Sequence, residues 1–331
     1  MGADAQSSVT TSVGAVFEPI RSDLQGVEIA IQRALDGPNP HIVELATYLQ
    51  RGGGKRLRPA LLLLTARNFE YDRERLLPVA AAVELIHMAT LVHDDIVDGA
   101  TSRRGLPTVG VRWGTGTAVL TGDFLFARAF SLLAADRDTR VVRVMAEAVY
   151  EMSTGEIEQQ EQLFDPSTGE EGYYRRIFKK TAHFISHCCL MGGLMGGAPE
   201  RQVEALRRYG YGIGMGFQVI DDILDLTGDP AELGKPRGTD LRSGVLTLPV
   251  LYALERDPQP WLLERLAARH VDEATIARVV EWVEETGGIA YARRQAEQFV
   301  AGALAALDEL AGAPMEPYLR ALARFILERS H

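Results

Sequence analysis

Cysteine is almost absent from this sequence, and the placement of the few that occur excludes two common ways of stabilising a fold. The 331 residues include two cysteines, Cys188 and Cys189, which are adjacent in the apolar stretch SHCCLMGGLMGG. Because they have no spaced cysteine or histidine partners, they form neither a disulfide framework nor a zinc site. We expect both thiols to pack in a buried helix, which fits a protein of the reducing cytoplasm.

Long hydrophobic runs are absent as well. The longest ones, such as PALLLLTA, are far too short to cross a bilayer, so we expect a soluble protein without a transmembrane segment. Residues 1–16, MGADAQSSVTTSVGAV, are small and polar, and they lack the basic region followed by an apolar run that marks a secretory signal. We expect this segment to be flexible.

An excess of basic residues is also lacking. The formal net charge of the chain is -10, whereas surfaces that bind nucleic acid are basic. The charge balance therefore argues against nucleic acid as the main partner. It favours a ligand that is cationic or bridged by a metal ion.

Alternating strand patterns and linkers rich in proline or serine are missing too. With 46% hydrophobic residues the chain can bury a sizeable core, and nearly every segment shows the 3.6-residue period of an amphipathic helix. We therefore predict an all-α fold, a helical bundle forming a single domain over residues 17–331 around a central cavity. The predicted helices cover residues 18–36, 40–51, 57–69, 74–97, 117–135, 138–163, 173–196, 200–226, 245–255, 273–286, 289–311 and 316–329.

The most informative pattern that is present is DDxxD, which occurs twice. Its carboxylates are Asp94, Asp95 and Asp98 in HDDIVD, and Asp221, Asp222 and Asp225 in FQVIDDILD. Residues four apart share one face of a helix, and like charges there destabilise it unless a cation screens them. A solvated acidic face is the alternative for a single copy. Two copies, each interrupting an apolar helix where unpaired charge is costly, favour a shared site for Mg²⁺ and a phosphate-bearing substrate.

An anionic substrate also needs cationic side chains, and several stand beside predicted chain breaks. They are Lys55 and Arg58 in GGGKRLRP, Arg103 and Arg104 in SRRG, Lys180 in FKKTA, and Lys235 in ELGKP. Arginine suits bidentate phosphate binding, and lysine supplies a point charge. Each of them alone would more often be a surface cation. Their proximity to the aspartate clusters favours a binding role instead.

Together these motifs resemble those of the trans-isoprenyl diphosphate synthases, the polyprenyl synthetase family. The resemblance runs from about residue 17 to the C-terminus and includes medium-chain and long-chain members such as heptaprenyl, octaprenyl and nonaprenyl diphosphate synthases. The motifs that carry it are GGKRLRP, HMATLVHDDIVDGATSRRG, GDFLFARAF, GE at Gly155, KT at Lys180, GFQVIDDILD, LGK and TLP. It implies a prenyltransferase with the isoprenoid synthase fold, usually a homodimer. Such an enzyme adds isopentenyl diphosphate head-to-tail to an allylic diphosphate and makes an all-trans polyprenyl diphosphate.

The resemblance also implies roles for individual residues. The six aspartates would hold three Mg²⁺ ions per active site. The allylic diphosphate would be bound by Arg103, Lys180 and Lys235, and isopentenyl diphosphate by Lys55, Arg58, His87 and Arg104. Thr181 and Gln218 would offer neutral dipoles to the allylic cation that forms when the carbon–oxygen bond ionises. Without the resemblance, His87 on its apolar helix would more often be a core histidine.

The length of the product depends on what blocks the path below the first aspartate cluster. Thr90 and Ala89 lie four and five residues before Asp94, roughly 6 and 7.5 Å along the helix axis. Short-chain relatives resemble this sequence but have bulky aromatic residues there. Because both residues are small, we expect a tunnel that continues toward Ile86 and Val83. The expected product has six to ten isoprene units, and geranylgeranyl diphosphate is the alternative.

Two other assignments compete with that of a catalytic synthase. A class I terpene cyclase also ionises allylic diphosphates, but the intact second DDxxD and the GGKRLRP segment count against it. A noncatalytic partner subunit of a heteromeric synthase stays open, because this chain has Ser243, Gly244 and Val245 where the family often has EGK. One diphosphate-binding lysine is thus missing, and we expect Lys235 and Arg242 to compensate for it.

Overall fold

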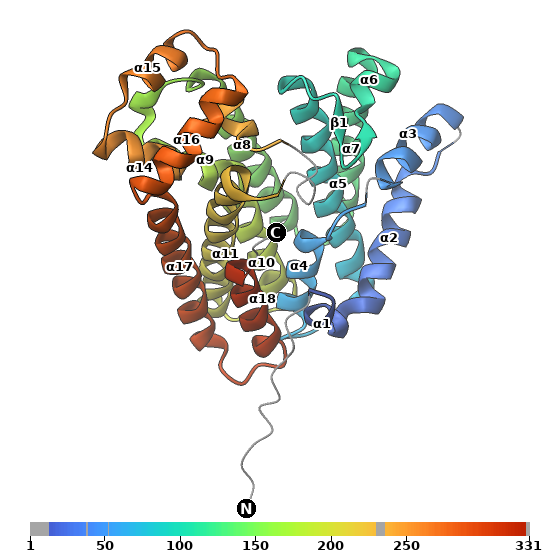
Figure 1. The fold of residues 1–331 in the computed structure, drawn as a ribbon. Helices are drawn as coiled ribbons and strands as arrows, with labels where there is room; N and C mark the ends of the chain where they lie inside the picture. The colour runs from blue at the N-terminus through green and yellow to red at the C-terminus, as the bar shows by residue number, and fades with distance from the viewer. Residues whose placement is uncertain (1–12, 38, 52, 230–235, 329–331) are drawn as a thin grey trace, which may run out of the picture.

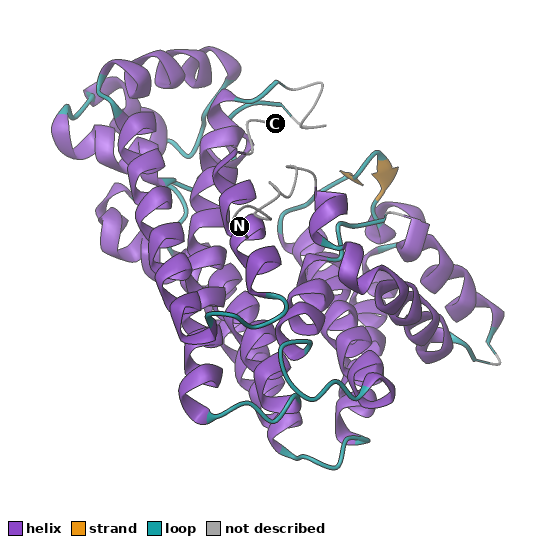
Figure 2. Ribbon diagram, turned by 90° about the horizontal axis from the view of Figure 1, so that it is seen from below, coloured by secondary structure: helices purple, strands orange, loops and turns teal. Residues whose placement is uncertain are grey.

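The computed structural model describes residues 13–37, 39–51, 53–229 and 236–328, and these residues are almost entirely helical (Figures 1 and 2). The predicted all-α fold is confirmed. The α-helices in chain order are α1 (Val13–Val16), α2 (Arg21–Leu35), α3 (Pro40–Arg51), α4 (Leu57–Ala66), α5 (Arg73–Val97), α6 (Val109–Trp113), α7 (Thr115–Ala134), α8 (Arg140–Glu161), α9 (Gly169–Ile177), α10 (His183–Met195), α11 (Glu200–Thr227), α13 (Thr239–Arg242), α14 (Leu248–Arg256), α15 (Pro260–Ala267), α16 (Glu273–Glu285), α17 (Gly288–Ala306) and α18 (Glu316–Glu328). Shorter turns are the 3₁₀ segments η1 (Glu18–Ile20), η2 (Pro166–Thr168) and η4 (Leu307–Leu310), and the π-helical segment η3 (Phe178–Ala182).

The hydrophobic period predicts the long helices closely and misses the short ones. Helices α5 and α11 begin and end within one residue of their predicted ranges. Helices α6, α13 and α15 were not predicted, because eight residues or fewer contain too few turns to show a period. The range 173–196, predicted as one helix, is divided into α9, η3 and α10.

The segment expected to be flexible at the N-terminus is partly ordered. Residues 1–12 lie outside the described part of the chain. Residues 13–16, by contrast, form α1, which packs against α18, and Val16 is buried.

A small hairpin, which the sequence analysis did not anticipate, follows α5. Its strands β1 (Ser102–Arg103) and β2 (Leu106–Pro107) pair antiparallel. Two-residue strands are too short to show alternation. The two residues between them have positive φ values, 51° at Arg104 and 77° at Gly105, as a tight hairpin turn requires. The turn holds the arginine pair beside the C-terminal end of α5.

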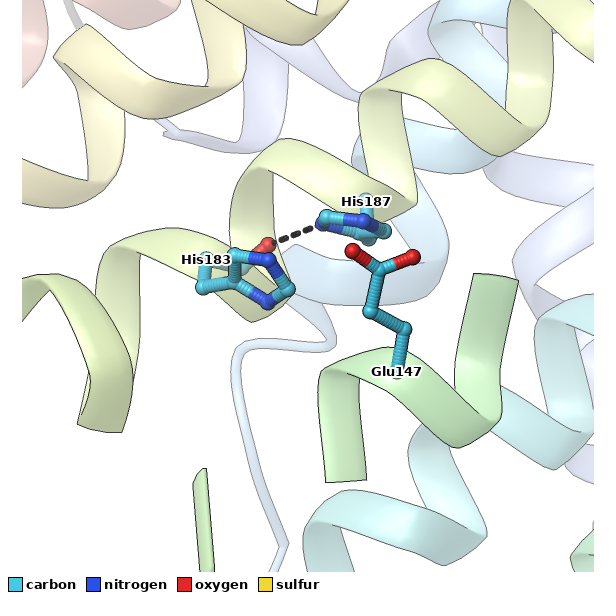
Figure 3. A group of neighbouring side chains, drawn as sticks. All are labelled: Glu147, His183 and His187. Atoms are coloured by element: carbon cyan, nitrogen blue, oxygen red, sulfur yellow. Dashed lines mark hydrogen bonds between the residues drawn. The ribbon is translucent and has the colours of Figure 1, made fainter. Parts of the chain in front are cut away.

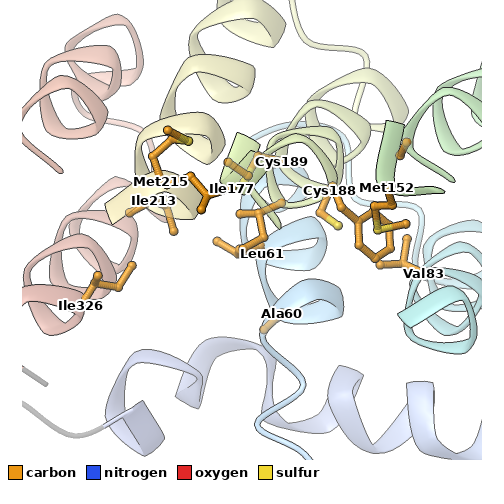
Figure 4. Packing of buried hydrophobic residues seen from close by; sticks show 14 of the residues in the cluster. Ala60, Leu61, Val83, Met152, Ile177, Cys188, Cys189, Ile213, Met215 and Ile326 are labelled. Atoms are coloured by element: carbon orange, nitrogen blue, oxygen red, sulfur yellow. The ribbon is translucent and has the colours of Figure 1, made fainter. Parts of the chain in front are cut away.

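The centre of the molecule is α10, which packs against α4, α8 and α11 (Figure 1). Nearly every side chain of α10 is buried, in agreement with its largely apolar sequence. Cys188 and Cys189 are free thiols in this core, as predicted (Figure 4). Burial raises the pKa of Cys188 to about 12, so this thiol is unreactive at neutral pH.

Helix α11 approaches its neighbours through glycines on two faces. A Cβ added to Gly214 would lie 2.5 Å from the Cα of Ala182, and one added to Gly210 would lie 2.7 Å from the Cα of Ser186. On the opposite face, a Cβ on Gly212 would lie 2.5 Å from the carbonyl oxygen of Phe299 in α17. The alternating glycines of YGYGIGMGF therefore let α11 sit between the η3–α10 segment and α17 at backbone contact.

Two helices are long and apolar enough to cross a membrane by length and composition alone, although the sequence contains no long uninterrupted apolar run. In α5, 67% of the most apolar stretch is buried within the fold, as expected for a core helix. In α7 only 33% is buried. This helix packs against α5 with one face and leaves Val119 and Leu120 exposed on another.

Candidate active site

The first aspartate cluster lies in the last turn of α5. Burial raises the pKa of Asp94 to about 6; the nearby carboxylates of Glu156 and Asp98 act in the same direction, and the charges of Lys180 and Arg103 oppose them. Burial also raises the pKa values of Asp95 and Asp98. Arg103 of the hairpin donates from Nε to Asp95 Oδ1 at 2.7 Å. Three carboxylates are thus held together at a cost that a cation would offset.

The second cluster lies at the C-terminal end of α11, which reaches the same end of the bundle as the last turn of α5 (Figure 1). Asp222 is buried and accepts hydrogen bonds from Tyr173 Oη at 2.7 Å and Gln218 Nε2 at 2.9 Å. Burial raises its pKa, and the carboxylate of Asp240 adds to the effect. Asp225 is also buried and accepts a hydrogen bond from the Asp240 amide at 3.2 Å, while Asp221 is half-buried.

Thr181 and Gln218, both predicted site residues, are joined to the second cluster by a chain of hydrogen bonds. Thr181 Oγ1 donates to Gln218 Oε1 at 2.9 Å, and the Gln218 amide group donates in turn to Asp222. Thr181 belongs to the π-helical segment η3, and such segments are frequent at functional sites.

Lys180, also in η3, connects the two clusters electrostatically. Its Nζ lies 2.6 Å from Glu156 Oε2, and its charge lowers the pKa values of Asp94 and Asp98. Glu156 also acts on Arg176, whose pKa is lowered by burial and raised by Asp222, Asp240 and Glu156. The structure therefore brings both clusters, Lys180, Thr181 and Gln218 into one region.

A cavity beside the first cluster is lined by three arginines and a histidine, together with acidic and apolar side chains. The side chains of Arg56, His87, Arg103, Arg104 and Asp95 are among those that line it. Burial holds the pKa of His87 well below its usual range, and four arginines lower it further. The imidazole is therefore neutral at pH 7, and the positive charge around it suits a multiply charged anion.

Of the basic pair predicted from GGGKRLRP, Lys55 is exposed and Arg58 lies deeper. The Arg58 guanidinium stacks 5.4 Å from the Phe184 ring, and its Nε has no hydrogen-bond partner among the described residues. The cation from this segment that lines the cavity is instead Arg56, which was not among the predicted site residues. It bonds Glu84 at 2.7 Å. A buried glutamate such as Glu84 requires a cationic partner, and that signal was present in the sequence.

Other site residues were also missed. Tyr173, Arg176 and Asp240 contact or surround the second cluster, although nothing in their local sequence distinguishes them from surface residues of a helix. Arg242, expected to replace a missing lysine, pairs instead with Glu273 at 2.5 Å. Lys235 lies outside the described residues.

The residues proposed to set chain length lie below the first cluster. Ile86 and Ala89 are fully buried, and Thr90 is half-buried with its hydroxyl bonded to the carbonyl oxygen of His87. Farther along α5, Val83 lies in the packed core together with Met152 and Cys188 (Figure 4).

The donor set fits hard divalent cations. Both clusters offer carboxylate oxygens, the ligands that Mg²⁺ and Ca²⁺ prefer, and they lack sulfur and imidazole ligands. The raised pKa values of Asp94 and Asp222 reflect the cost of ionising a carboxyl group in a poorly solvated place. A bound cation would stabilise them.

Comparisons with known proteins agree with one another. The sequence profile of the polyprenyl synthetase family matches residues 39–283. Heptaprenyl diphosphate synthase component 2 of Geobacillus stearothermophilus is 40% identical, covering 96% of this chain and 99% of that protein. Octaprenyl diphosphate synthase of Escherichia coli is 36% identical, covering 95% and 98%. The crystal structure of a polyprenyl synthase from Caulobacter crescentus, complexed with calcium and isoprenyl diphosphate, superposes with a TM-score of 0.92 at 34% identity, covering 98% of this chain and 100% of that chain.

Proposed function

This chain belongs to the polyprenyl synthetase family and is a trans-prenyl diphosphate synthase, a prenyltransferase of isoprenoid biosynthesis, and from that premise we propose that its product has six to ten isoprene units. The observation that carries the proposal is the pair of small residues, Ala89 and Thr90, directly below the first aspartate cluster. The heptaprenyl and octaprenyl synthases among its relatives support the same range.

The six aspartates would hold the divalent cations of the site, and we propose that these are Mg²⁺. Bound there, such ions would neutralise negative charge on a departing diphosphate. The solved Caulobacter relative contains calcium, which has the same preference for oxygen ligands.

The chain's own cations have complementary tasks. Lys180 and Arg103 stand beside the first cluster, where they would bind the allylic diphosphate and stabilise the charge it gains as the carbon–oxygen bond breaks. Lys235 keeps its predicted role in the same step. Thr181 and Gln218 would present neutral dipoles to the allylic cation.

Isopentenyl diphosphate would occupy the cavity lined by His87 and Arg104, with Arg56 added to the predicted set. Neutral His87 would serve as a hydrogen-bond partner rather than as a charge. Exposed Lys55 and half-buried Arg58 would contribute through their longer-range charge. The double bond of this substrate would then attack the cation, and the carbocation so formed would lose a proton, which by resemblance to the family the departed diphosphate accepts. The apolar walls would exclude water.

We also propose that the chain acts as a homodimer. The exposed side of α7 carries Val119 and Leu120, and α8 adds exposed Tyr150 and Ile157. Apolar side chains gathered on neighbouring helices are typical of subunit interfaces. Sedimentation at twice the chain mass of 36.3 kDa would support this, and a monomeric species would contradict it.

In a second candidate function, the chain is one component of a heteromeric prenyl diphosphate synthase. As a catalytic or noncatalytic component, it would need a different chain for activity. The Geobacillus relative is named component 2, which implies another component in that enzyme. The absence of a lysine at Val245 gives this candidate further support.

Product analysis of the purified protein separates these possibilities. It would be incubated with Mg²⁺, labelled isopentenyl diphosphate and, separately, geranyl, farnesyl or geranylgeranyl diphosphate. We expect a ladder ending at six or more units. A ladder that stops at four units would identify a geranylgeranyl diphosphate synthase. No product from any primer would favour the two-component enzyme.

Ala89→Tyr is expected to shorten the product by several isoprene units. The ring would project into the path below Asp94, whereas Ala89→Ser, the control of similar size, should leave the product length unchanged. Products would be sized by reversed-phase chromatography alongside the melting temperature of each variant. An unchanged ladder in a folded Ala89→Tyr protein would show that the chain grows along another path.

A further inference from the structure

A second group of possible metal ligands lies at the C-terminal end of η3, where α10 begins. It comprises Glu147 of α8 and His183 and His187 of α10, and one ligand atom from each lies within 4.8 Å of the other two (Figure 3). The histidines are four residues apart, so their rings share one face of α10. Figure 3 shows the Glu147 carboxylate reaching from α8 toward these rings.

The hydrogen bonds of the two rings leave nitrogen lone pairs available. His187 Nδ1 donates to the carbonyl oxygen of His183 at 2.8 Å, so its Nε2 carries the lone pair. Metal-binding histidines characteristically make this kind of bond, which fixes the tautomer and the orientation of the ring. His183 Nδ1 is buried and has no hydrogen-bond partner among the described residues. The contact between the two rings, whose centroids are 4.0 Å apart, is explained by packing alone. Packing does not explain why His183 Nδ1 is buried without a hydrogen-bond partner among the described residues.

Both imidazoles are neutral at pH 7, the form that binds metals. Burial, together with the nearby His187 and Arg207, lowers the pKa of His183 to about 4. Burial also lowers the pKa of His187. Arg207 lowers this pKa too, whereas Glu147 and Glu151 raise it. Both rings are nearly buried, with exposed fractions of 7% and 6%, whereas Glu147 is exposed. An ion could therefore enter from the solvent side.

We propose that Glu147, His183 and His187 bind a transition-metal ion of the Zn²⁺ class. Two histidines four residues apart on a helix, completed by a carboxylate, form a known zinc-binding set that leaves the fourth position to water. Metal–ligand bonds of about 2.0–2.1 Å place tetrahedral ligands about 3.3 Å apart. Rotation of the exposed Glu147 side chain and of the rings would close the present spacing. The donor set of two nitrogens and one oxygen distinguishes this site from the all-oxygen aspartate clusters.

Occupation of this site would affect the segment that carries the diphosphate-binding residues. His183 directly follows η3, which contains Lys180 and Thr181, and α8 contributes both Glu147 and Glu156. An ion between α8 and the start of α10 would fasten η3 at one end. The proposal does not depend on the chain length of the product.

Co²⁺ titration of the chelator-treated full-length protein tests the proposal. Excess Mg²⁺ would be present to compete for the aspartate clusters. Imidazole-bound tetrahedral Co²⁺ absorbs strongly in the visible region, whereas Co²⁺ with six oxygen ligands absorbs weakly. We expect one strongly absorbing Co²⁺ per chain, displaced by Zn²⁺, and a melting temperature raised by either ion.

Variants connect the signal to these residues. Glu147→Gln, at an exposed position that does not threaten folding, should weaken Co²⁺ binding at least about tenfold, and His187→Asn should abolish the strong band. His270→Asn, an exposed histidine elsewhere, and Asp94→Asn should leave the band unchanged. The proposal is overturned if no strong band forms, if Glu147→Gln binds as tightly as the parent protein, or if Asp94→Asn removes the band.

Discussion

Asp94→Asn is expected to lower kcat by about 10²- to 10³-fold, the usual effect of removing one group that stabilises charge in a transition state. The amide keeps the size of the side chain but removes the negative charge that a divalent cation requires. Initial rates would be measured with an allylic primer over a range of Mg²⁺ concentrations. We expect both a lower kcat and a higher Mg²⁺ requirement.

The same variant should fold at least as stably as the parent protein when divalent cations are absent. Burial raises the pKa of Asp94 to about 6, so the folded state holds this proton more tightly than the unfolded chain does. The contribution of the Asp94 carboxyl group to the free energy of unfolding is therefore fully present at low pH and is lost as the pH rises toward 6. Asparagine is neutral at every pH, so the variant does not lose this stability as the pH rises.

Asp36→Asn is the matched control, since Asp36 is exposed at the end of α2. It should change neither rate nor Mg²⁺ requirement. If Asp94→Asn kept the parent rate, the first cluster would have no part in catalysis. If it lost both rate and stability, its effect would be structural.

Gly214→Ala is expected to lower the free energy of unfolding by about 3 kcal/mol, at the upper end of the usual cost of overpacking a core. The added methyl group would lie 2.5 Å from the Cα of Ala182 and 2.9 Å from its Cβ. Relief requires η3 to move away from α11, and that movement would separate Thr181 from Gln218. We therefore expect kcat to fall as well. Urea denaturation followed by circular dichroism would measure the stability.

Gly302→Ala provides the comparison within a helix. No atom lies within 4 Å of a Cβ added there, so the substitution gains helix propensity and should stabilise α17 by about 0.5–1 kcal/mol. Equal stabilities of the two variants would mean that α11 and η3 do not meet at backbone contact.

The sequence predicts two kinds of feature in this fold and site. These are helices with a clear hydrophobic period, and charged side chains whose burial would be strongly unfavourable without a partner. The 25 residues of α5 show many helical periods, and its aspartates require a cation wherever they lie. Local sequence patterns do not show that Arg56, and not Arg58, lines the cavity. The direction of the Arg56 side chain depends on its left-handed backbone conformation, with φ 47°, at the start of α4, and on its ion pairs with the distant Glu28 and Glu84. The roles of Tyr173 and Arg176 likewise depend on how α9 is oriented relative to α11.

That orientation follows from the π-helical segment η3. A π-helical turn is equivalent to an α-helix with one residue inserted, and one residue corresponds to a rotation of about 100° around the helix axis. The side chains of α9 and α10 are therefore out of phase with those of one continuous helix. Tyr173 before η3 faces Asp222, and His187 after it faces α8. A deletion of one residue here would restore a regular helix and turn Tyr173 away from the second cluster, so this segment is constrained in its length as much as in its composition.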